Sequence, residues 1–375
     1  MTAVSTTTTT TTTPPTTTMD DLPIFGAAQA EREARLVARL RELTVHHVDR
    51  CPSYANIVRT VFPQWDRPDR DPTLADLPYV PVGLFKRRDL KSVPEDEVFK
   101  VVTSSGTTGQ PSRVFLDRDT AQIQARTLSA IMTHVLGKQR RPMLVVDTDA
   151  ILRNPAGHTA RAAGVLGMMN LGRKHVFLLD ADMAERADRL AEFVADYEGE
   201  DLLIFGFTFM VWQHLQQRFG SDGIDLSRAT LVHSGGWKTM EAERVGNPEF
   251  RQALGEAFGL RHIVNFYGMA EQVGSVFVEG DDGYLHPCRE ADVLIRHPST
   301  LKVVPDGEVG LIQVLSTLPT SYPGHSILTE DIGVIHATDE DPLGGKAFQV
   351  LGRSRRSELR GCSDTYARAT QGTPA

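Results

Sequence analysis

Apolar residues recur along this chain in two patterns, one with the period of a helix and one with the short runs of buried strands. Between Phe25 and Val48 they repeat at helical spacing among arginine and glutamate residues, which predicts an amphipathic helix. Further along the chain, short aliphatic runs alternate with amphipathic segments. The predicted strands cover residues 143–147, 176–179, 202–205 and 229–233, and the predicted helices cover residues 183–197 and 210–219. This alternation is typical of an α/β fold with a mostly parallel sheet covered by helices.

Beyond Ile263 the pattern changes to short strands separated by turn signals such as Asp281-Asp282-Gly283 and Pro305-Asp306-Gly307. It predicts an antiparallel β region joined to the α/β part, with strands over residues 275–279, 293–296, 311–315 and 333–336. We therefore expect three segments. Residues 1–18 form a Thr-rich tail that buries too little apolar surface to fold, residues 19–353 form the folded domain, and residues 354–375 form a short C-terminal tail.

The composition narrows the class of protein. A net charge of −8 gives no reason to expect a nucleic-acid partner. No run approaches the roughly 18 consecutive apolar residues that a membrane-spanning helix needs, so we expect no membrane span and a cytoplasmic protein. Three cysteines, Cys51, Cys288 and Cys362, are too few and too scattered for a disulfide framework or a zinc site.

A loop rich in serine, threonine and glycine is the first candidate site. It comprises Ser104, Ser105, Gly106, Thr107, Thr108 and Gly109, between a β-branched run that ends at Thr103 and a second apolar run that begins at Val114. Glycines let such a loop curl around a ligand, so that its backbone N–H groups and hydroxyls converge on a phosphate. The loop lacks the Gly-Lys-Ser/Thr ending of the phosphate loop of ATPases, so it would bind phosphate differently. A flexible linker is the alternative.

Four later motifs follow this loop in order. They are "HSGGW" at residues 233–237, "NFYGMAEQ" at 265–272, "TEDIGVI" at 329–335 and "LGRSRRSELRGCSD" at 351–364. The first two each follow a predicted strand, and ligands of open α/β sheets bind at the carboxyl ends of strands. Together with the loop, the series resembles the ordered motifs of the adenylate-forming superfamily. "VPVGLFK" at residues 80–86 and the Arg-Gly-Cys at 360–362 resemble more narrowly the acyl-protein synthetases of bacterial bioluminescence, the LuxE-like family.

The resemblance implies a role for each motif residue. Ser104 to Gly109 would wrap the phosphates of ATP. Gly235 and Gly236 would lie against adenine, and Tyr267, Gly268 and Met269 would line the space between adenine and the acyl group. Glu271 would hold Mg²⁺, a hard cation that prefers oxygen ligands. Asp331 would accept hydrogen bonds from the ribose hydroxyls, and Arg353 would face the phosphate or the ribose.

The resemblance also implies a fold and a reaction. The fold would be the large N-terminal domain of adenylate-forming enzymes, with no C-terminal lid domain, because only residues 354–375 follow Arg353. The reaction would be that of an ATP-dependent ligase that activates a carboxylic or fatty acid as an acyl-adenylate. Cys362 would then accept the acyl group as a thioester and pass it to a partner protein, a reductase or a carrier protein. The arginines around Cys362 favour its reactive thiolate form.

The source of positive charge for adenylation stays open in the sequence. Most superfamily members carry a catalytic lysine on the lid, and Lys86, Lys238 and the C-terminal arginines are equal candidates to replace it. Arg113 stands where many members have a lysine after the phosphate loop, which keeps the charge but changes its geometry.

The roles of one aromatic run and of three histidines stay open as well. The run at residues 205–212 is either part of the substrate pocket or core, and His158, His233 and His325 are either bases or structural histidines. Two further functions are compatible with the motifs. One is an adenylating enzyme of secondary metabolism that transfers an aryl or small acyl group to an amine, an alcohol or a carrier protein. The second is a non-catalytic nucleotide-binding partner.

Overall fold

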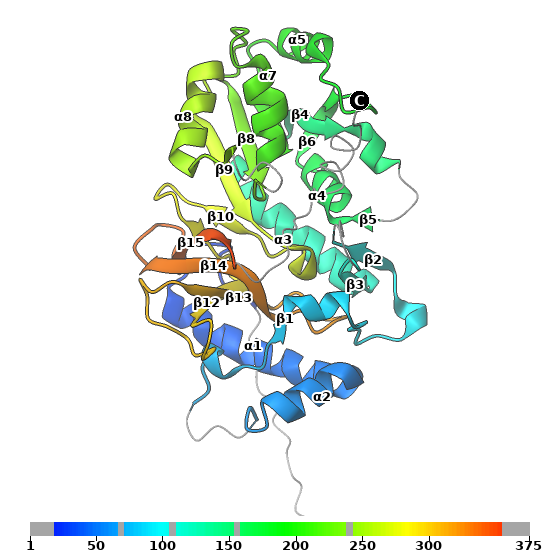
Figure 1. Cartoon of the computed structure of the whole chain (residues 1–375), viewed down its shortest axis with the longest axis vertical. Coiled ribbons are helices and arrows are strands. Elements are labelled where there is room, and N and C mark those ends of the chain that lie inside the picture. The colour runs from blue at the N-terminus through cyan, green and yellow to red at the C-terminus, as the bar shows by residue number, and fades with distance from the viewer. Residues whose placement is uncertain (1–18, 67–70, 105–109, 154–157, 238–242, 355–375) are drawn as a thin grey trace, which may run out of the picture.

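One twelve-stranded sheet runs through the part of the chain that the computed structural model describes, residues 19–66, 71–104, 110–153, 158–237 and 243–354 (Figure 1). Its strand order is β12-β13-β14-β15-β11-β10-β9-β8-β7-β4-β6, and β1 pairs with β14 beside this path. The expected tails at residues 1–18 and 355–375 lie outside the described residues, so their predicted boundaries stay predictions.

Five parallel strands form one half of the sheet. They are β4 (Arg141–Thr148), β6 (Gly172–Leu179), β7 (Leu202–Phe207), β8 (Ala229–Ser234) and β9 (His262–Tyr267). The central strands β7 and β8 are buried throughout, as expected where helices cover both faces. The α/β prediction is therefore confirmed, and each predicted strand of this half exists with longer ends.

Antiparallel strands form the other half and continue the same sheet from β9. They are β10 (Phe277–Glu279), β11 (Leu285–His286), β12 (Ala291–Arg296), β13 (Gly310–Ser316), β14 (Ser326–Thr338) and β15 (Lys346–Arg353). A separate small sheet joins β2 (Lys100–Thr103), β3 (Arg113–Leu116) and β5 (His158–Thr159). The antiparallel region is as predicted, but β14 begins at Ser326 and not near Gly333. Its polar start is buried, and Thr329 offsets the cost of this burial by donating a hydrogen bond to the Ile312 carbonyl of β13.

Helices cover the sheet on both sides (Figure 1). The longer ones are α1 (Gln29–Arg50), α2 (Pro52–Val61), α3 (Arg118–Leu136), α4 (Ala160–Met169), α5 (Ala187–Asp196) and α8 (Asn247–Phe258), and α6 (Thr208–Met210), the π-helix η6 (Val211–Gln216) and α7 (Gln217–Phe219) form one continuous helical segment. Single-turn helices are η1 (Met19–Asp21), η2 (Leu74–Asp76), η3 (Val82–Lys86), η4 (Glu95–Glu97), η5 (Asp149–Leu152) and η8 (Ala270–Gln272). Within the described residues, no helix combines the length and the apolar character required to cross a bilayer.

The helix predicted over residues 183–197 starts four residues late, at Ala187. Met183 adopts a left-handed conformation with φ of 66°, and Glu185 forms a bridge with Leu179 of β6. A turn therefore precedes the helix, because a residue in the left-handed conformation cannot be part of a right-handed helix.

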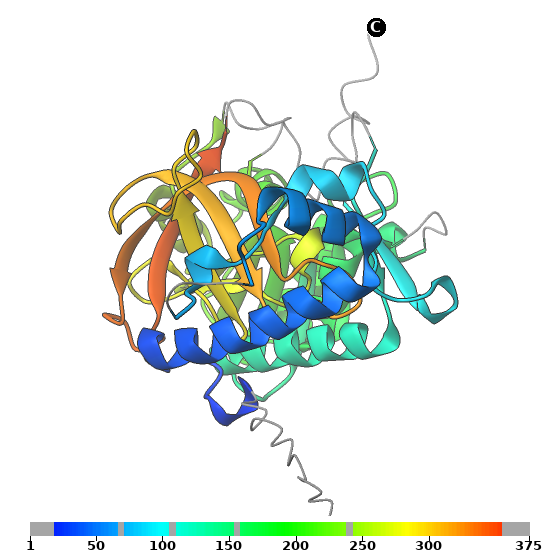
Figure 2. The ribbon, with the colours of Figure 1, turned by 90° about the horizontal axis from the view of Figure 1, so that it is seen from below.

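Helix α1 lies along the antiparallel half of the sheet (Figure 2). Its buried leucines pack in one cluster with Leu294 of β12 and Leu315 of β13. At its N-terminal end, Gln29 donates a hydrogen bond to the fully buried carboxylate of Asp292, and Arg32 lies 3.4 Å from the same group. The apolar face of the amphipathic helix predicted from the sequence thus packs against these strands.

Two stacked and fully buried histidines join α1 to the loop that precedes β14. The rings of His47 and His325 lie 4.9 Å apart. His47 contacts the Ser92 hydroxyl at 2.7 Å and the Pro319 carbonyl at 3.1 Å, and His325 Nε2 lies 3.0 Å from the Thr44 hydroxyl. Burial lowers the pKa of His325 to about 3 and holds the pKa of His47 well below its ordinary value. Both rings are therefore neutral, and His325 has a structural role.

We expect acid to destabilise the fold through this histidine pair. Unfolding exposes both rings, which bind protons below about pH 6.5, whereas the folded protein keeps them neutral to much lower pH. Because the unfolded state binds more protons, the free energy of unfolding should fall by about 1.4 kcal/mol per pH unit for each ring as the pH drops below about 6. Urea unfolding followed by circular dichroism between pH 7.5 and pH 5 measures this slope.

A matched pair of variants assigns the slope to the buried rings. His325→Gln should make the pH dependence shallower by about the share of one ring. His262→Gln removes an exposed histidine of β9 and should keep the wild-type slope. Equal slopes in the wild type and His325→Gln would contradict the assignment.

Candidate active site

The expected adenine-binding residues leave two neighbouring strands at the same edge of the sheet. β8 and β9 run parallel with Ser234 paired to Phe266, so Gly235 and Gly236 emerge beside the expected residues Tyr267, Gly268 and Met269. Gly235 has a φ of 87°, a left-handed conformation that favours glycine. A Cβ at Gly235 would lie 3.5 Å from the Phe207 ring, so the two exposed glycines form a flat surface against an aromatic wall.

Tyr267, Asp331 and Arg353 form a contiguous polar cluster. Asp331 of β14 is paired with Arg353 of β15, and Arg353 Nε lies 3.4 Å from Asp331 Oδ1. The Tyr267 hydroxyl donates a 2.6 Å hydrogen bond to Asp331 Oδ2. Burial, followed by the charge of Asp331, holds the pKa of Tyr267 well above its ordinary value, so the phenol stays protonated and donates. The two short strands β10 and β11 lie between β9 and β15 in the sheet, so this contact joins strands that are not neighbours.

Glu271 is a buried carboxylate next to this cluster. It lies in η8, the short helix that follows Met269, and only 5% of its surface is exposed. Its carbonyl accepts a 3.0 Å hydrogen bond from the hydroxyl of the fully buried Tyr322. Burial raises the pKa of Glu271, and the Ser112 hydroxyl and the charges of Lys86 and Arg353 act in the opposite direction. The carboxylate therefore lies beside one hydroxyl and within the electrostatic influence of two cations.

The base of the Ser/Thr/Gly-rich loop adjoins Glu271. β2 and β3 pair antiparallel up to Thr103 and Arg113. Beyond that pair, the Ser112 N–H donates to Ser104 Oγ at 2.9 Å, and the Ser104 N–H donates to the Ser112 carbonyl at 3.2 Å. The strand–loop–strand prediction is confirmed at its two strands and at Ser104. Ser105, Gly106, Thr107, Thr108 and Gly109 lie outside the described residues, as do Lys238 and Cys362.

The surroundings of Glu271 suit a hard cation. Ser112 Oγ is buried and makes no hydrogen bond of standard geometry among the described residues, although it is close enough to Glu271 to lower the pKa of that carboxyl group. Mg²⁺ is commonly held by one or two carboxylates together with phosphate oxygens and water. The buried carboxylate and the unsatisfied hydroxyl provide such a setting. They lie at the base of the Ser/Thr/Gly-rich loop at residues 104–109, for which the sequence predicts phosphate binding and which we call the phosphate-type loop. Ser112 was not found by sequence reasoning, because no motif distinguishes it from any other serine near a loop.

Most of the histidine and aromatic residues that the sequence left open belong to the buried core. His233 is buried, its Nδ1 lies 3.0 Å from the Thr208 hydroxyl, and burial lowers its pKa to about 3, so it is a neutral structural histidine. Residues 205–211 are buried, which makes this run core, although Phe207 borders Gly235. His158 lies in β5, paired with Val102 of β2, near the entrance to the phosphate-type loop.

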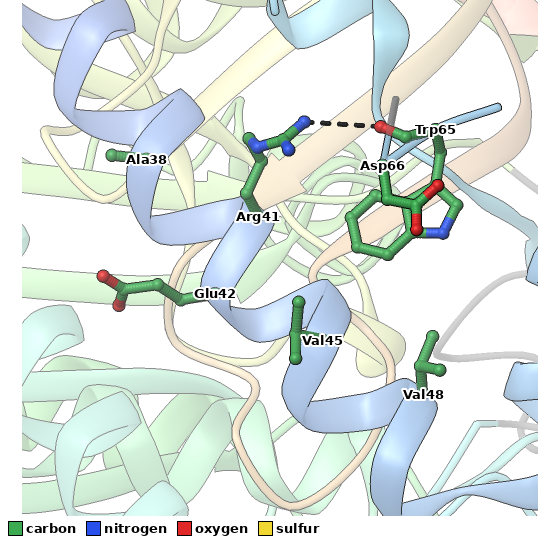
Figure 3. Close-up of a pocket in the computed structure, with 7 residues that line it drawn as sticks. All are labelled: Ala38, Arg41, Glu42, Val45, Val48, Trp65 and Asp66. Carbon is green, nitrogen blue, oxygen red and sulfur yellow. Dashed lines mark hydrogen bonds between the residues drawn. The ribbon is translucent and has the colours of Figure 1, made fainter. Parts of the chain in front are cut away.

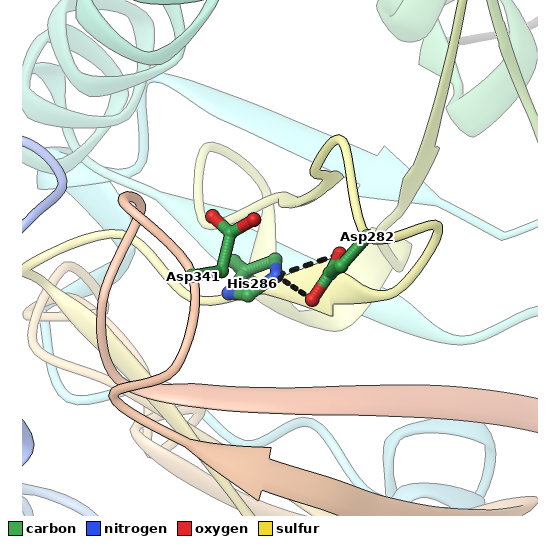
Figure 4. Close-up of side chains that lie close together, drawn as sticks. All are labelled: Asp282, His286 and Asp341. Atoms are coloured by element: carbon green, nitrogen blue, oxygen red, sulfur yellow. Dashed lines mark hydrogen bonds and ion pairs between the residues drawn. The ribbon is translucent and has the colours of Figure 1, made fainter.

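Two further surface features contain none of the expected site residues. Figure 3 shows a groove between the outer face of α1 and Trp65, where Arg41 donates to the Trp65 carbonyl at 3.3 Å. Figure 4 shows Asp282, His286 and Asp341, whose side chains approach one another between two turns of the antiparallel half. His286 Nε2 lies 3.0 Å from Asp282, so this contact ties the turn to β11.

Known proteins resemble this chain in sequence and in fold. The family described as acyl-protein synthetase, LuxE, matches residues 19–370. The chain is 25% identical over 306 residues to a long-chain-fatty-acid–luciferin-component ligase of Aliivibrio fischeri, with 80% of each chain covered. It is also 25% identical over 307 residues to the ligase of the same name from Vibrio harveyi, with 79% of each chain covered.

Solved structures of the same fold include adenylate-bound enzymes. The fold is similar to an open conformation of 2-hydroxyisobutyryl-CoA ligase in complex with its acyl-adenylate and CoA, with a TM-score of 0.67 at 18% identity, covering 97% of this chain and 80% of the other. The thioesterification state of that ligase gives a TM-score of 0.64 at 18% identity, covering 88% and 69%. This likeness supports the expected adenylate-forming fold. Because the family match spans nearly the whole described chain, the protein belongs to the acyl-protein synthetase, LuxE, family.

Proposed function

We propose that this protein is an ATP-dependent acyl-protein ligase that activates a carboxylic acid, in the first instance a fatty acid, as an acyl-adenylate. The acyl group then passes to Cys362 as a thioester and from there to a partner protein. The observation that carries the proposal is the meeting of Tyr267, Glu271, Asp331 and Arg353 beside the base of the phosphate-type loop. Family membership and two relatives named as fatty-acid ligases support it.

The polar cluster would bind the nucleotide. Tyr267 holds one oxygen of Asp331 and Arg353 faces the other, which fixes the carboxylate in one orientation. Asp331 retains 16% side-chain exposure, so its lone pairs can accept hydrogen bonds from ribose hydroxyls. Gly235 and Gly236 leave room for the flat adenine ring. Glu271, with Ser112 beside it, would hold Mg²⁺, which when bound offsets the negative charge of the phosphates.

The adenylation step is a substitution at phosphorus. A carboxylate oxygen of the acid forms a bond to the α-phosphorus, and the bond from that phosphorus to the bridging oxygen breaks. Its electron pair leaves with pyrophosphate. Both reactants are anions, so their approach requires fixed positive charge and N–H donors that are already oriented. Arg353 and the backbone of the loop from Ser104 onward supply such groups in this proposal.

The cysteines differ in their ability to accept the acyl group. Cys51 and Cys288 are buried, and burial raises the pKa of both thiols, which disfavours the reactive thiolate. Cys362 follows Arg353 by nine positions in a run rich in arginine. Nine extended residues span at most about 30 Å, so a chain of this length can bring a thiol to an adenylate bound near Arg353.

A second candidate substrate is an aryl or small acid, and the aromatic wall behind the glycine pair favours it. Phe207 borders Gly235, and the rings of Trp212, Trp237 and Phe250 lie 5.5–6.2 Å from one another next to it. Of these residues only Trp212 is half-buried and the others are buried, so it carries the ring on which an aryl acid would stack. Acid-dependent exchange of labelled pyrophosphate into ATP, measured across fatty, aryl and small acids, separates the two substrate classes.

The thioester step predicts covalent labelling at one cysteine. Wild-type protein incubated with ATP, Mg²⁺ and a labelled fatty acid should retain label that neutral hydroxylamine removes. Cys362→Ala should lose at least nine-tenths of this label and keep pyrophosphate exchange, because adenylation precedes the acyl transfer. Cys51→Ala, the control, should label as the wild type does. Label retained on Cys362→Ala would remove this cysteine from the mechanism.

Glu271→Gln keeps the shape of the side chain but removes its charge. We expect pyrophosphate exchange to fall by about 10²-fold or more, as for other losses of electrostatic stabilisation in an active site. Binding gives a second readout. Chelation of Mg²⁺ should weaken ATP binding to the wild type, measured by calorimetry, and should affect Glu271→Gln much less. Equal chelator effects in both proteins would show that Glu271 does not hold the cation.

Asp331→Asn tests the ribose contact. The wild type should bind ATP more tightly than 2′,3′-dideoxy-ATP, and the variant should lose most of this discrimination because an amide is a weaker acceptor than a carboxylate. Asp306→Asn, an exposed aspartate that accepts a hydrogen bond from Thr338 in the same half of the sheet, serves as the control and should discriminate as the wild type does. Unchanged discrimination in Asp331→Asn would exclude this contact.

A further inference from the structure

Lys86 is brought to the candidate active site by a strand pairing that the motifs do not reveal. β1 (Val80–Pro81) pairs in parallel with β14, and Pro81 lies opposite Leu328. η3 follows β1 at once and continues along β14 toward Asp331. A Cβ at Gly83 would lie 3.8 Å from the Glu330 carboxylate, which places η3 beside the residue that precedes Asp331. Lys86 is the last residue of this helix and is half-buried, and the helix contacts β14 and β3.

Packing holds η3 and Glu271 in one unit. The buried Phe85, next to Lys86, has its ring 6.2 Å from that of Tyr322 at an angle of 81°. The Tyr322 hydroxyl in turn donates to the Glu271 carbonyl. Both η3 and η8 also contact β3, the strand that leaves the phosphate-type loop. Lys86 and Glu271 are therefore positioned by shared neighbours, next to the base of that loop.

Arg113, the cation that directly follows the loop, is directed elsewhere. Its guanidinium pairs with Asp89, lies over the Phe115 ring at 5.3 Å, and belongs to a side chain that is 48% exposed. The residue before it, Ser112, is the one that is buried beside Glu271. Arg113 thus occupies the surface of the small sheet, although its sequence position suggests a role in the site.

We propose that the ammonium group of Lys86 binds the phosphate groups of ATP in this site. The proposal rests on the proposed function for the presence of ATP. A triphosphate placed among Glu271, Asp331 and an incoming carboxylate adds negative charge to an acidic site. Arg353 faces Asp331, whereas Lys86 ends η3, the helix that contacts β3 at the base of the loop. A lysine ammonium is a compact charge suited to phosphate oxygens.

Binding of ATP and of adenosine separates a phosphate contact from a structural one. The dissociation constants of both ligands are measured by calorimetry for the wild type, Lys86→Gln, Lys86→Arg and Arg113→Gln. We expect Lys86→Gln to weaken ATP binding at least tenfold and adenosine binding less than twofold. Lys86→Arg, which keeps the charge, should recover most of the ATP affinity. Arg113→Gln, the matched control, should bind both ligands as the wild type does.

Two outcomes would overturn the proposal for Lys86. One is wild-type ATP affinity in Lys86→Gln, and the other is an equal loss of ATP and adenosine affinity, which would indicate a structural role. Pyrophosphate exchange measured on the same proteins keeps this result distinct from the proposed function. If the wild type catalyses pyrophosphate exchange and Lys86→Gln binds ATP as the wild type does, only the lysine contact is refuted, and the proposed function stands. If the wild type binds ATP but catalyses no pyrophosphate exchange with any acid, the ligase reaction is refuted. The comparison of ATP and adenosine binding then still decides the role of Lys86.

Discussion

The burial of one carboxylate, Glu271, is the constraint on which the rest of the candidate site depends. A buried carboxylate resists ionisation unless cations or hydrogen-bond donors lie close to it. Here burial raises the pKa of Glu271, and Ser112, Lys86 and Arg353 oppose that rise from three different elements. The site thus concentrates charges that only partly compensate one another. Such an arrangement suits the binding of a cation together with a polyanion, since each ligand supplies the charge that the other needs.

The sheet makes this concentration of charge possible through its change of direction. Parallel strands deliver Gly235, Gly236 and Tyr267 to one edge, and the antiparallel half returns to the same place to deliver Asp331 and Arg353. The loop before β14 then connects the site to the core, because Tyr322 holds the Glu271 carbonyl while His325 stacks on His47 of α1. The geometry of the site therefore depends on the packing of an N-terminal helix that carries none of its polar groups.

Membership of the acyl-protein synthetase, LuxE, family and the polar cluster bear on different steps of the reaction. In the proposed function the cluster concerns the nucleotide: Asp331 would bind the ribose, Glu271 would hold a cation, and two basic groups act on the same region. In the proposed reaction the transfer of the acyl group depends on a thiol, and the buried Cys51 and Cys288 are unsuited to it. In this proposal, the residues of the sheet activate the acid, and the transfer of the acyl group depends on the residues that follow β15.

The sequence by itself determined the alternation of strands and helices, because periodicity and turn residues are local properties, and it gave the order of the motifs that contain the candidate site residues. It missed α2, α3, α4 and α8 and extended one helix to Met183, which instead belongs to a local turn with Asp180. It also shortened β14, because the burial of Ser326 and Thr329 depends on their contacts with β13. It also gave equal weight to Lys86, Lys238 and the C-terminal arginines. Only the tertiary structure placed η3, which ends at Lys86, along β14 and turned Arg113 toward Asp89, since local sequence patterns do not specify either contact.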